Sequence, residues 1–185
     1  MRKNFGAKPI LYPQPVFILG SYDENGRPNA MNAAWGGISE SDMITMCISE
    51  GHKTTKDILK SGEFTVSMGV ADEVVACDFV GIASGNNMSD KMERTGWTAT
   101  KAEFVNAPVF DKLPMALECR LVSYDPETAC LIGKVINVSA DESVLTDGVI
   151  DPFKLRPLVF DANGMAYHVL GEKVGNAFSD GKKLK

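Results

Sequence analysis

Three turn segments, each set between two runs of β-favouring residues, place the strongest constraint on the fold of this chain. They are Glu24-Asn25-Gly26-Arg27, Asp125-Pro126-Glu127-Thr128 and Asp161-Ala162-Asn163-Gly164. The Asn-Gly pair of the first segment is the strongest short signal for a hairpin, because both central residues of a type I′ turn need positive φ. The three segments predict antiparallel hairpins, so the fold is expected to be mainly β.

The runs around these turns give the expected strands, and short amphipathic stretches between them give helices. Strands are expected at 16–23, 28–35, 43–49, 63–68, 115–124, 129–138, 158–160 and 165–170. Helices are expected at 54–62, with Thr54 as N-cap and Gly62 as stop, and at 72–83 and 90–95. Short strands at this spacing favour an antiparallel barrel or sandwich, and a Rossmann fold fits poorly.

Length and charge exclude several classes of function. The 185 residues suit one domain, expected to span 1–185. The net charge of −5 disfavours general nucleic-acid binding, which depends on Lys and Arg neutralising phosphates. No apolar run approaches the roughly 18 residues of a membrane span, and the first residues do not resemble a secretory signal. We therefore expect a cytoplasmic protein without nucleic-acid or membrane partners.

Cysteines and histidines give no sign of a metal site. The chain has two histidines, far apart, and four cysteines without C-x-x-C spacing, at Cys47, Cys77, Cys119 and Cys130. The cysteines lie in apolar contexts, which is typical of buried reduced thiols. Disulfide and zinc frameworks are not expected.

The segment 29–37, Asn-Ala-Met-Asn-Ala-Ala-Trp-Gly-Gly, is unusually rich in small residues for a predicted strand. A flat ligand lying against the backbone would explain it, with Asn29 and Asn32 as hydrogen-bonding groups and Trp35 as a wall. Tight packing against a neighbouring sheet or subunit explains it equally well.

A second candidate site lies at the start of the helix expected at 54–62, where His52-Lys53-Thr54-Thr55 combines an ammonium with two hydroxyls. Free N–H groups and the helix dipole make such a position suitable for an anion. An ordinary capped helix is the alternative, and Asp57 adds a negative charge nearby. Lys91, in Ser89-Asp90-Lys91-Met92, is either a ligand-binding or a solvated surface lysine.

Taken together, these segments resemble the flavin reductase-like family, and within it the flavoredoxin branch, from about Pro15 to about Gly181. The resemblance is carried by the order of segments at 28–35, Ser49 with 53–55, 90–91, 117–120, 156–160, 167–171 and 177–181. It implies an FMN-binding split β-barrel, a Greek-key antiparallel barrel with a few short helices. It also implies a homodimer with FMN near the subunit interface.

The resemblance also implies roles for individual residues. Asn29, Met31, Asn32 and Trp35 would line the isoalloxazine ring, and Ser49, Lys53, Thr54 and Thr55 would hold the phosphate. Lys91 would contact the cofactor from the other side of the pocket, and Phe160 would close it. No catalytic side chain and no metal ligand are expected, because the flavin carries the chemistry.

Three functions follow from this interpretation. The first is an FMN-dependent oxidoreductase of flavin reductase type that takes electrons from NAD(P)H. The second is a flavoredoxin-type carrier that takes electrons from one redox protein and gives them to another, without a small-molecule substrate. The third is a ligand-binding or scaffold protein with a degenerate pocket. The sequence does not distinguish NADH from NADPH or name the acceptor.

Overall fold

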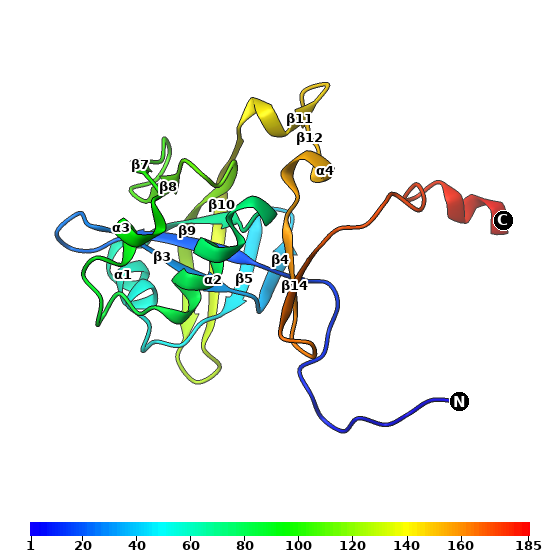
Figure 1. Cartoon of the computed structure of the whole chain (residues 1–185), viewed down its shortest axis with the longest axis horizontal. Coiled ribbons are helices and arrows are strands. Elements are labelled where there is room, and N and C mark those ends of the chain that lie inside the picture. The colour runs from blue at the N-terminus through cyan, green and yellow to red at the C-terminus, as the bar shows by residue number, and fades with distance from the viewer.

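A seven-stranded antiparallel sheet that curls on itself forms the body of the protein (Figure 1). The computed structural model describes residues 1–185 throughout. The seven strands are β2 (Phe17–Tyr22), β3 (Pro28–Ala33), β4 (Gly36–Glu40), β5 (Met43–Cys47), β6 (Glu63–Met68), β9 (Met115–Asp125) and β10 (Cys130–Ala140). Their order in the sheet is β3-β2-β6-β9-β10-β5-β4. Strands that are distant in the chain are therefore neighbours, and the predicted mainly β, antiparallel Greek-key fold is confirmed.

Shorter elements lie around this sheet. The third predicted hairpin, β13 (Leu158–Asp161) and β14 (Ala166–Val169), forms a separate small sheet with β1 (Gln14–Pro15). Two further pairs are β7 (Ala99–Lys101) with β8 (Pro108–Phe110) and β11 (Leu145–Thr146) with β12 (Val149–Ile150). The helices are α1 (Lys53–Ser61), α2 (Val74–Ile82), α3 (Lys91–Thr95) and α4 (Pro152–Leu155), with 3₁₀ turns η1 (Ala71–Glu73), η2 (Glu142–Val144) and η3 (Asp180–Leu184).

The β2–β3 hairpin is confirmed, but its predicted turn type is wrong. Gly26 has φ +73°, whereas Asn25 is not among the residues with positive φ. The Gly26 N–H donates to the Asp23 carbonyl at 2.9 Å, and Asp23 N–H donates to the Arg27 carbonyl. This is a type I turn followed by a left-handed glycine. The Asp23 carboxylate stabilises it by accepting from the backbone N–H groups of Asn25 and Arg27.

The predicted strand at 28–35 ends two residues early in the structure, and it is followed by a strand that the sequence did not predict. β3 ends at Ala33, and Gly36 begins β4, which pairs with β5 instead of continuing beside β2. A Cβ on Gly36 would lie 2.6 Å from the Thr45 carbonyl oxygen and 2.8 Å from Met46 Cβ. Gly36 is therefore required for close packing of the strands. At this position, tight packing and not a ligand explains the small residue.

Helix α1 ends as predicted but begins one residue earlier. Gly62 has φ +73°, and its N–H donates to the Ile58 carbonyl. The prediction of Thr54 as N-cap is wrong, because the helix begins after His52 and no side chain caps it. The Thr54 hydroxyl instead accepts a hydrogen bond from Asn29 on β3.

Two clusters of buried hydrophobic side chains lie on opposite sides of the sheet. One fills the inside of the curl, where Leu19, Ile44, Phe64 and Leu131 are completely buried. The other lies beneath α2 and includes Val80. Burial of one such side chain contributes about 1.5–3 kcal/mol, so these clusters hold β3, α1 and α2 in place around the site.

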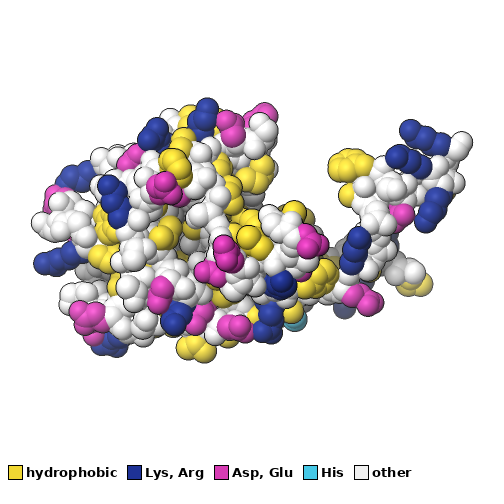
Figure 2. All heavy atoms as spheres, turned by 90° about the horizontal axis from the view of Figure 1, so that it is seen from above, with side chains coloured by type: hydrophobic (Ala, Val, Ile, Leu, Met, Phe, Trp, Pro, Cys, Tyr) yellow, Lys and Arg dark blue, Asp and Glu magenta, His cyan; other side chains and the backbone are white.

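Both ends of the chain lie away from the body of the molecule (Figure 1). Residues 1–13 are all exposed, and the C-terminal arm that follows β14 stands clear of the globule (Figure 2). Val174, Phe178 and Leu184 on this arm are almost fully exposed. None of the helices is both long and apolar enough to cross a membrane.

The prediction that all four cysteines are buried is wrong for two of them. Cys77 and Cys119 are fully buried, and burial raises their pKa values to about 11 and about 12. Cys47 is exposed and Cys130 is partly exposed, because each lies at the end of its strand on the outer face of the sheet.

Candidate functional site

A groove runs across the region where β3, α1 and α2 meet, and it consists of three adjoining cavities. An apolar cavity of about 390 Å³ shares Met31, Asn32 and His52 with a central cavity of about 300 Å³. The central cavity shares Lys53 and Lys91 with a polar cavity of about 800 Å³. The groove therefore passes from an apolar end to a polar end within one continuous space.

The apolar end brings together predicted residues from distant parts of the chain. Met31, Asn32 and Trp35 line it from the β3–β4 segment, and Phe160 lines it from the β13–β14 hairpin. Trp35 is 54% exposed, so its ring forms an open wall and not part of the core. These four residues lie together as the sequence predicted.

The small residues of 29–37 serve two purposes. Ala33 and Ala34 line the apolar cavity, which agrees with a flat ligand close to the backbone. Ala30, in contrast, is fully buried in the core beneath α2. The two explanations offered by the sequence thus apply to different residues of the same segment.

Two polar contacts fix the apolar end. The Asn32 amide donates to the Cys77 carbonyl of α2 at 2.9 Å, which ties β3 to the helix. Tyr167 donates its hydroxyl to Asp78 Oδ1 at 2.8 Å. Burial, followed by the hydrogen bond to Asp78, raises the pKa of Tyr167 to about 12. Sequence reasoning missed Asp78 and Tyr167 as lining residues, because their pairing joins segments that only the fold brings together.

The polar end is built on the uncapped start of α1. Asn29 Nδ2 donates to Thr54 Oγ1 at 2.6 Å, and both side chains are buried. Asn29 lines the central and polar cavities, not the apolar one. Thr55 is fully buried, and its hydroxyl has no hydrogen-bond partner within the chain. The uncapped N–H groups at the start of α1 form an environment that favours an anion, whereas Thr55 does not line any of the three cavities.

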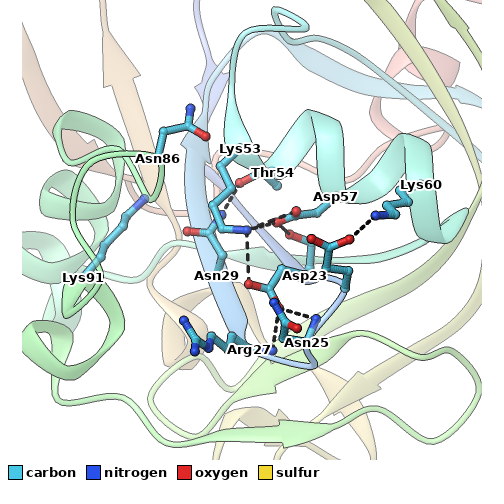
Figure 3. Close-up of polar contacts among 12 residues, drawn as sticks. Asp23, Asn25, Arg27, Asn29, Lys53, Thr54, Asp57, Lys60, Asn86 and Lys91 are labelled. Carbon is cyan, nitrogen blue, oxygen red and sulfur yellow. Dashed lines mark hydrogen bonds and ion pairs between the residues drawn. The ribbon is translucent and has the colours of Figure 1, made fainter.

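Lys53 lies at the polar end but is already paired with carboxylates (Figure 3). Its Nζ is 3.1 and 3.0 Å from the two Asp57 oxygens and 3.6 Å from Asp23 Oδ2. Burial raises the pKa of Asp57 above its ordinary value, and the ammonium opposes this change. Burial acts in the same direction on Asp23, but backbone N–H groups and Lys53 lower its pKa overall.

Lys91 reaches the groove from the segment around α3, on the other side from α1 (Figure 3). Its side chain is buried, and Nζ donates to the Ala30 carbonyl at 2.6 Å and the Val80 carbonyl at 3.0 Å. Burial lowers its pKa to about 8. An ammonium has three N–H donors, so one remains for a ligand. The alternative of a solvated surface lysine is therefore wrong.

Two predicted residues, Ser49 and Thr55, do not line the three cavities, whereas other residues line them without having been predicted. Ser49 is exposed, accepts from the Gly51 N–H at 3.3 Å and does not line the three cavities. Arg27 and Asn86 line the polar cavity. Gly85 lies so close to the site that an added Cβ would be 2.6 Å from Asn29 Oδ1 and 2.9 Å from Lys53 Cδ. No local motif marks these residues.

The groove thus suits a long ligand with an apolar planar part and an anionic end. Comparison with known proteins defines the class. The model of the flavin reductase like domain matches residues 10–167, and the chain belongs to this family. The fold is that family's split β-barrel.

Solved structures give a finer comparison. The flavoredoxin of Desulfovibrio vulgaris (Miyazaki F) is 38% identical, with a TM-score of 0.93 over 98% of this chain and 100% of that one. A flavoredoxin from Methanosarcina acetivorans is 25% identical, with a TM-score of 0.90 over the whole of both chains. An FMN-binding domain of a flavin reductases-like enzyme from Shewanella baltica shares the fold at 23% identity, with a TM-score of 0.77 over 88% and 89% of the two chains. Within its family, the chain groups with the flavoredoxin branch.

Proposed function

We propose that this protein binds FMN non-covalently in the groove and acts as an NAD(P)H-dependent, flavin reductase-like oxidoreductase. The observation that carries the proposal is the single groove with one apolar end and one polar end, where Lys53 and Lys91 lie near the start of α1. FMN has a matching form, since a planar ring system is joined by a ribityl chain to one phosphate. The family membership and the FMN-binding relative from Shewanella baltica support this choice of flavin.

The apolar end would hold the isoalloxazine ring. Trp35 and Phe160 would bound the ring, and Met31 would pack beneath it. Asn32 is already held by its hydrogen bond to Cys77, so its remaining polar atoms are positioned for the ring edge. Bound FMN would supply the hydride and electron chemistry that protein side chains lack, and the chain would bind and orient it.

The polar end would hold the phosphate. Lys53 and Lys91 would contribute positive charge from two sides, and Thr54 would contribute a hydroxyl at the start of α1. Thr55 does not line the groove and would need to change its side-chain position to contribute a second hydroxyl. Asn29 lies here, so we assign it to the ribityl and phosphate side. Ser49 would need to turn toward the groove to join the site. Because the groove has one such anion-binding end, FMN suits it better than a cofactor with two phosphates.

A flavoredoxin-type carrier is the second candidate function. The 38% identity to the Desulfovibrio flavoredoxin over nearly the whole of both chains favours it. The same groove would serve both functions, because both use the bound flavin and differ in the molecules with which it exchanges electrons. A carrier would accept electrons from a redox protein, whereas a reductase would accept a hydride from NAD(P)H.

A homodimer completes the proposal. The wall formed by Trp35 is open to solvent, and the two chain ends extend away from the globule with exposed apolar side chains. A second copy would cover both surfaces and shield the flavin. Exposed apolar patches of this kind are typical of interaction sites.

Spectroscopy of the pure protein tests these proposals. A flavin spectrum is expected, and the cofactor released by heat should run as FMN in chromatography. Finding FAD or haem, or no chromophore after reconstitution with FMN, would overturn the proposal. Anaerobic NADH or NADPH should bleach the flavin if the protein is a reductase. A flavin that dithionite bleaches, but neither nucleotide does, would identify a carrier.

A further inference from the structure

Cys47 and Cys130 are direct partners in the antiparallel pairing of β5 with β10. The neighbouring residues Ile48 and Ala129 are joined by a hydrogen bond from N–H to carbonyl at 2.8 Å. The Cys47 N–H turns the other way and donates to Trp35. Since hydrogen-bonded and non-hydrogen-bonded pairs alternate along an antiparallel ladder, the two cysteines form a non-hydrogen-bonded pair.

This register brings the two thiols within bonding reach. Directly opposite residues of a non-hydrogen-bonded pair have Cα atoms about 4.5 Å apart. Disulfides span Cα separations of about 4.4–6.8 Å, so no strand needs to move far. Met46 and Leu131, which adjoin the two cysteines in their strands, face the core. Because side chains alternate between the two faces of a sheet, both cysteines point to the outer face.

Exposure distinguishes this pair from the other cysteines. Cys47 is exposed and Cys130 partly exposed, while Cys77 and Cys119 are sealed in the two cores. Cys47 also lines the apolar end of the groove. An incoming reagent can therefore reach Cys47 directly, with Cys130 beside it as a resolving thiol.

We propose that Cys47 and Cys130 form a redox-active dithiol site that reacts with small-molecule disulfides of the glutathione type. The site rests on strand register and exposure, and it does not depend on a bound flavin. Because Cys47 lines the apolar cavity, oxidation of the two thiols to a disulfide would link β5 covalently to β10 directly beside that cavity.

The reaction takes place in two exchange steps. The Cys47 thiolate attacks one sulfur of the small disulfide, whose S–S bond breaks and releases one thiolate. The Cys130 thiolate then attacks Cys47 Sγ, forming the protein disulfide and releasing the second thiolate. Two electrons pass from the protein to the reagent, and the two protons lost by the cysteines end on the two released thiols.

The test is a peptide map of the full-length protein after incubation with glutathione disulfide, acid quenching and alkylation. The expected product is one Cys47–Cys130 disulfide, with Cys77 and Cys119 still alkylated as free thiols and full reversal by dithiothreitol. In Cys130→Ser the reaction should stop at a glutathione adduct on Cys47. In Cys47→Ser no internal disulfide should form.

Several results would overturn the proposal. Wild-type protein that keeps a glutathione adduct on Cys47 beside a free Cys130 would show that the pair does not close. A disulfide between two chains, or one involving Cys77 or Cys119, would also contradict it. So would unreactive native thiols under conditions in which the urea-unfolded chain reacts. Circular dichroism checks that the serine variants fold, and the wild-type map decides alone if they do not.

Discussion

Lys53 Nζ lies 3.0 Å from Asp57 Oδ2, one turn further along α1, so the proposed phosphate-binding lysine is held by a carboxylate of its own helix. Its side chain is 23% exposed and also lies 3.6 Å from Asp23. The ammonium is thus positioned before any ligand binds. It also offsets two negative charges that would otherwise face the phosphate.

Replacement of Lys53 by Ala should weaken FMN binding about ten- to a hundredfold. Charge-assisted hydrogen bonds contribute about 1.5–3 kcal/mol, and about 1.4 kcal/mol is a factor of ten. Riboflavin lacks the phosphate, so its affinity should change little. Titration of both ligands into apo-protein measures the difference.

Lys56 provides the matched control for this experiment, since it lies on the same helix and is exposed to solvent. Lys56→Ala should leave both affinities unchanged. Equal losses of FMN and riboflavin in Lys53→Ala would indicate a folding defect. No loss of FMN would remove Lys53 from the site.

Gly85→Ala should also weaken FMN binding, although residue 85 carries no charge. The new Cβ would lie 2.6 Å from Asn29 Oδ1 and 2.9 Å from Lys53 Cδ. Asn29 cannot yield easily, because it is buried and bonded to Thr54. Gly37→Ala, with nothing within 4 Å of the added Cβ, is the control. Equal FMN affinities for the two variants in the same titration would contradict the tight approach of the 85 loop.

The sequence predicted those parts of the fold that depend on local signals. Turn residues and the alternation of apolar and polar residues predicted β6 at 63–68 and the end of α1 at Gly62. β4 was missed because Gly36 and Gly37 are poor strand formers, and the pairing with β5 that stabilises them is not local.

In the candidate site, too, local clusters of residues could be predicted and contacts between distant segments could not. Lys53 and Thr54 are adjacent in sequence and could be found as a cluster. The pairing of Tyr167 with Asp78 joins a hairpin to α2, and no spacing rule indicates it. The opposition of Cys47 and Cys130 likewise depends on strand order, which hydrophobic periodicity does not determine.

The protein should be a homodimer in solution. Light scattering of the holo-protein at micromolar concentration should give twice the 20.0 kDa mass of one chain. Removal of the C-terminal arm after residue 171 should weaken the dimer, because it deletes the exposed Val174, Phe178 and Leu184. A full-length protein with the mass of one chain would defeat the prediction.

Gly133→Ala should destabilise the fold by about 1–3 kcal/mol through overpacking. The added methyl group would collide with the ring of Phe64, which is completely buried and has no open space to enter. Urea unfolding monitored by circular dichroism measures the change, with Gly37→Ala as the control. A midpoint equal to that of the wild type would show that the core yields at this position.

FMN affinity should fall as the pH rises through about 8, the pKa to which burial lowers Lys91. Below this pH the Lys91 ammonium carries a charge that attracts the phosphate, and above it the amine is neutral. The second pKa of a phosphate monoester is about 6, so FMN itself gains no further phosphate charge in this range. Phosphate binding favours the protonated lysine, so the midpoint of this pH dependence should lie higher in the complex than in the apo-protein.

Titrations of FMN and riboflavin on both sides of this pH are the measurement, and only the affinity for FMN should respond. In Lys91→Gln, which cannot titrate, the pH dependence should disappear together with part of the FMN affinity. An unchanged pH profile in that variant would assign the titration to another group and remove Lys91 from the phosphate site.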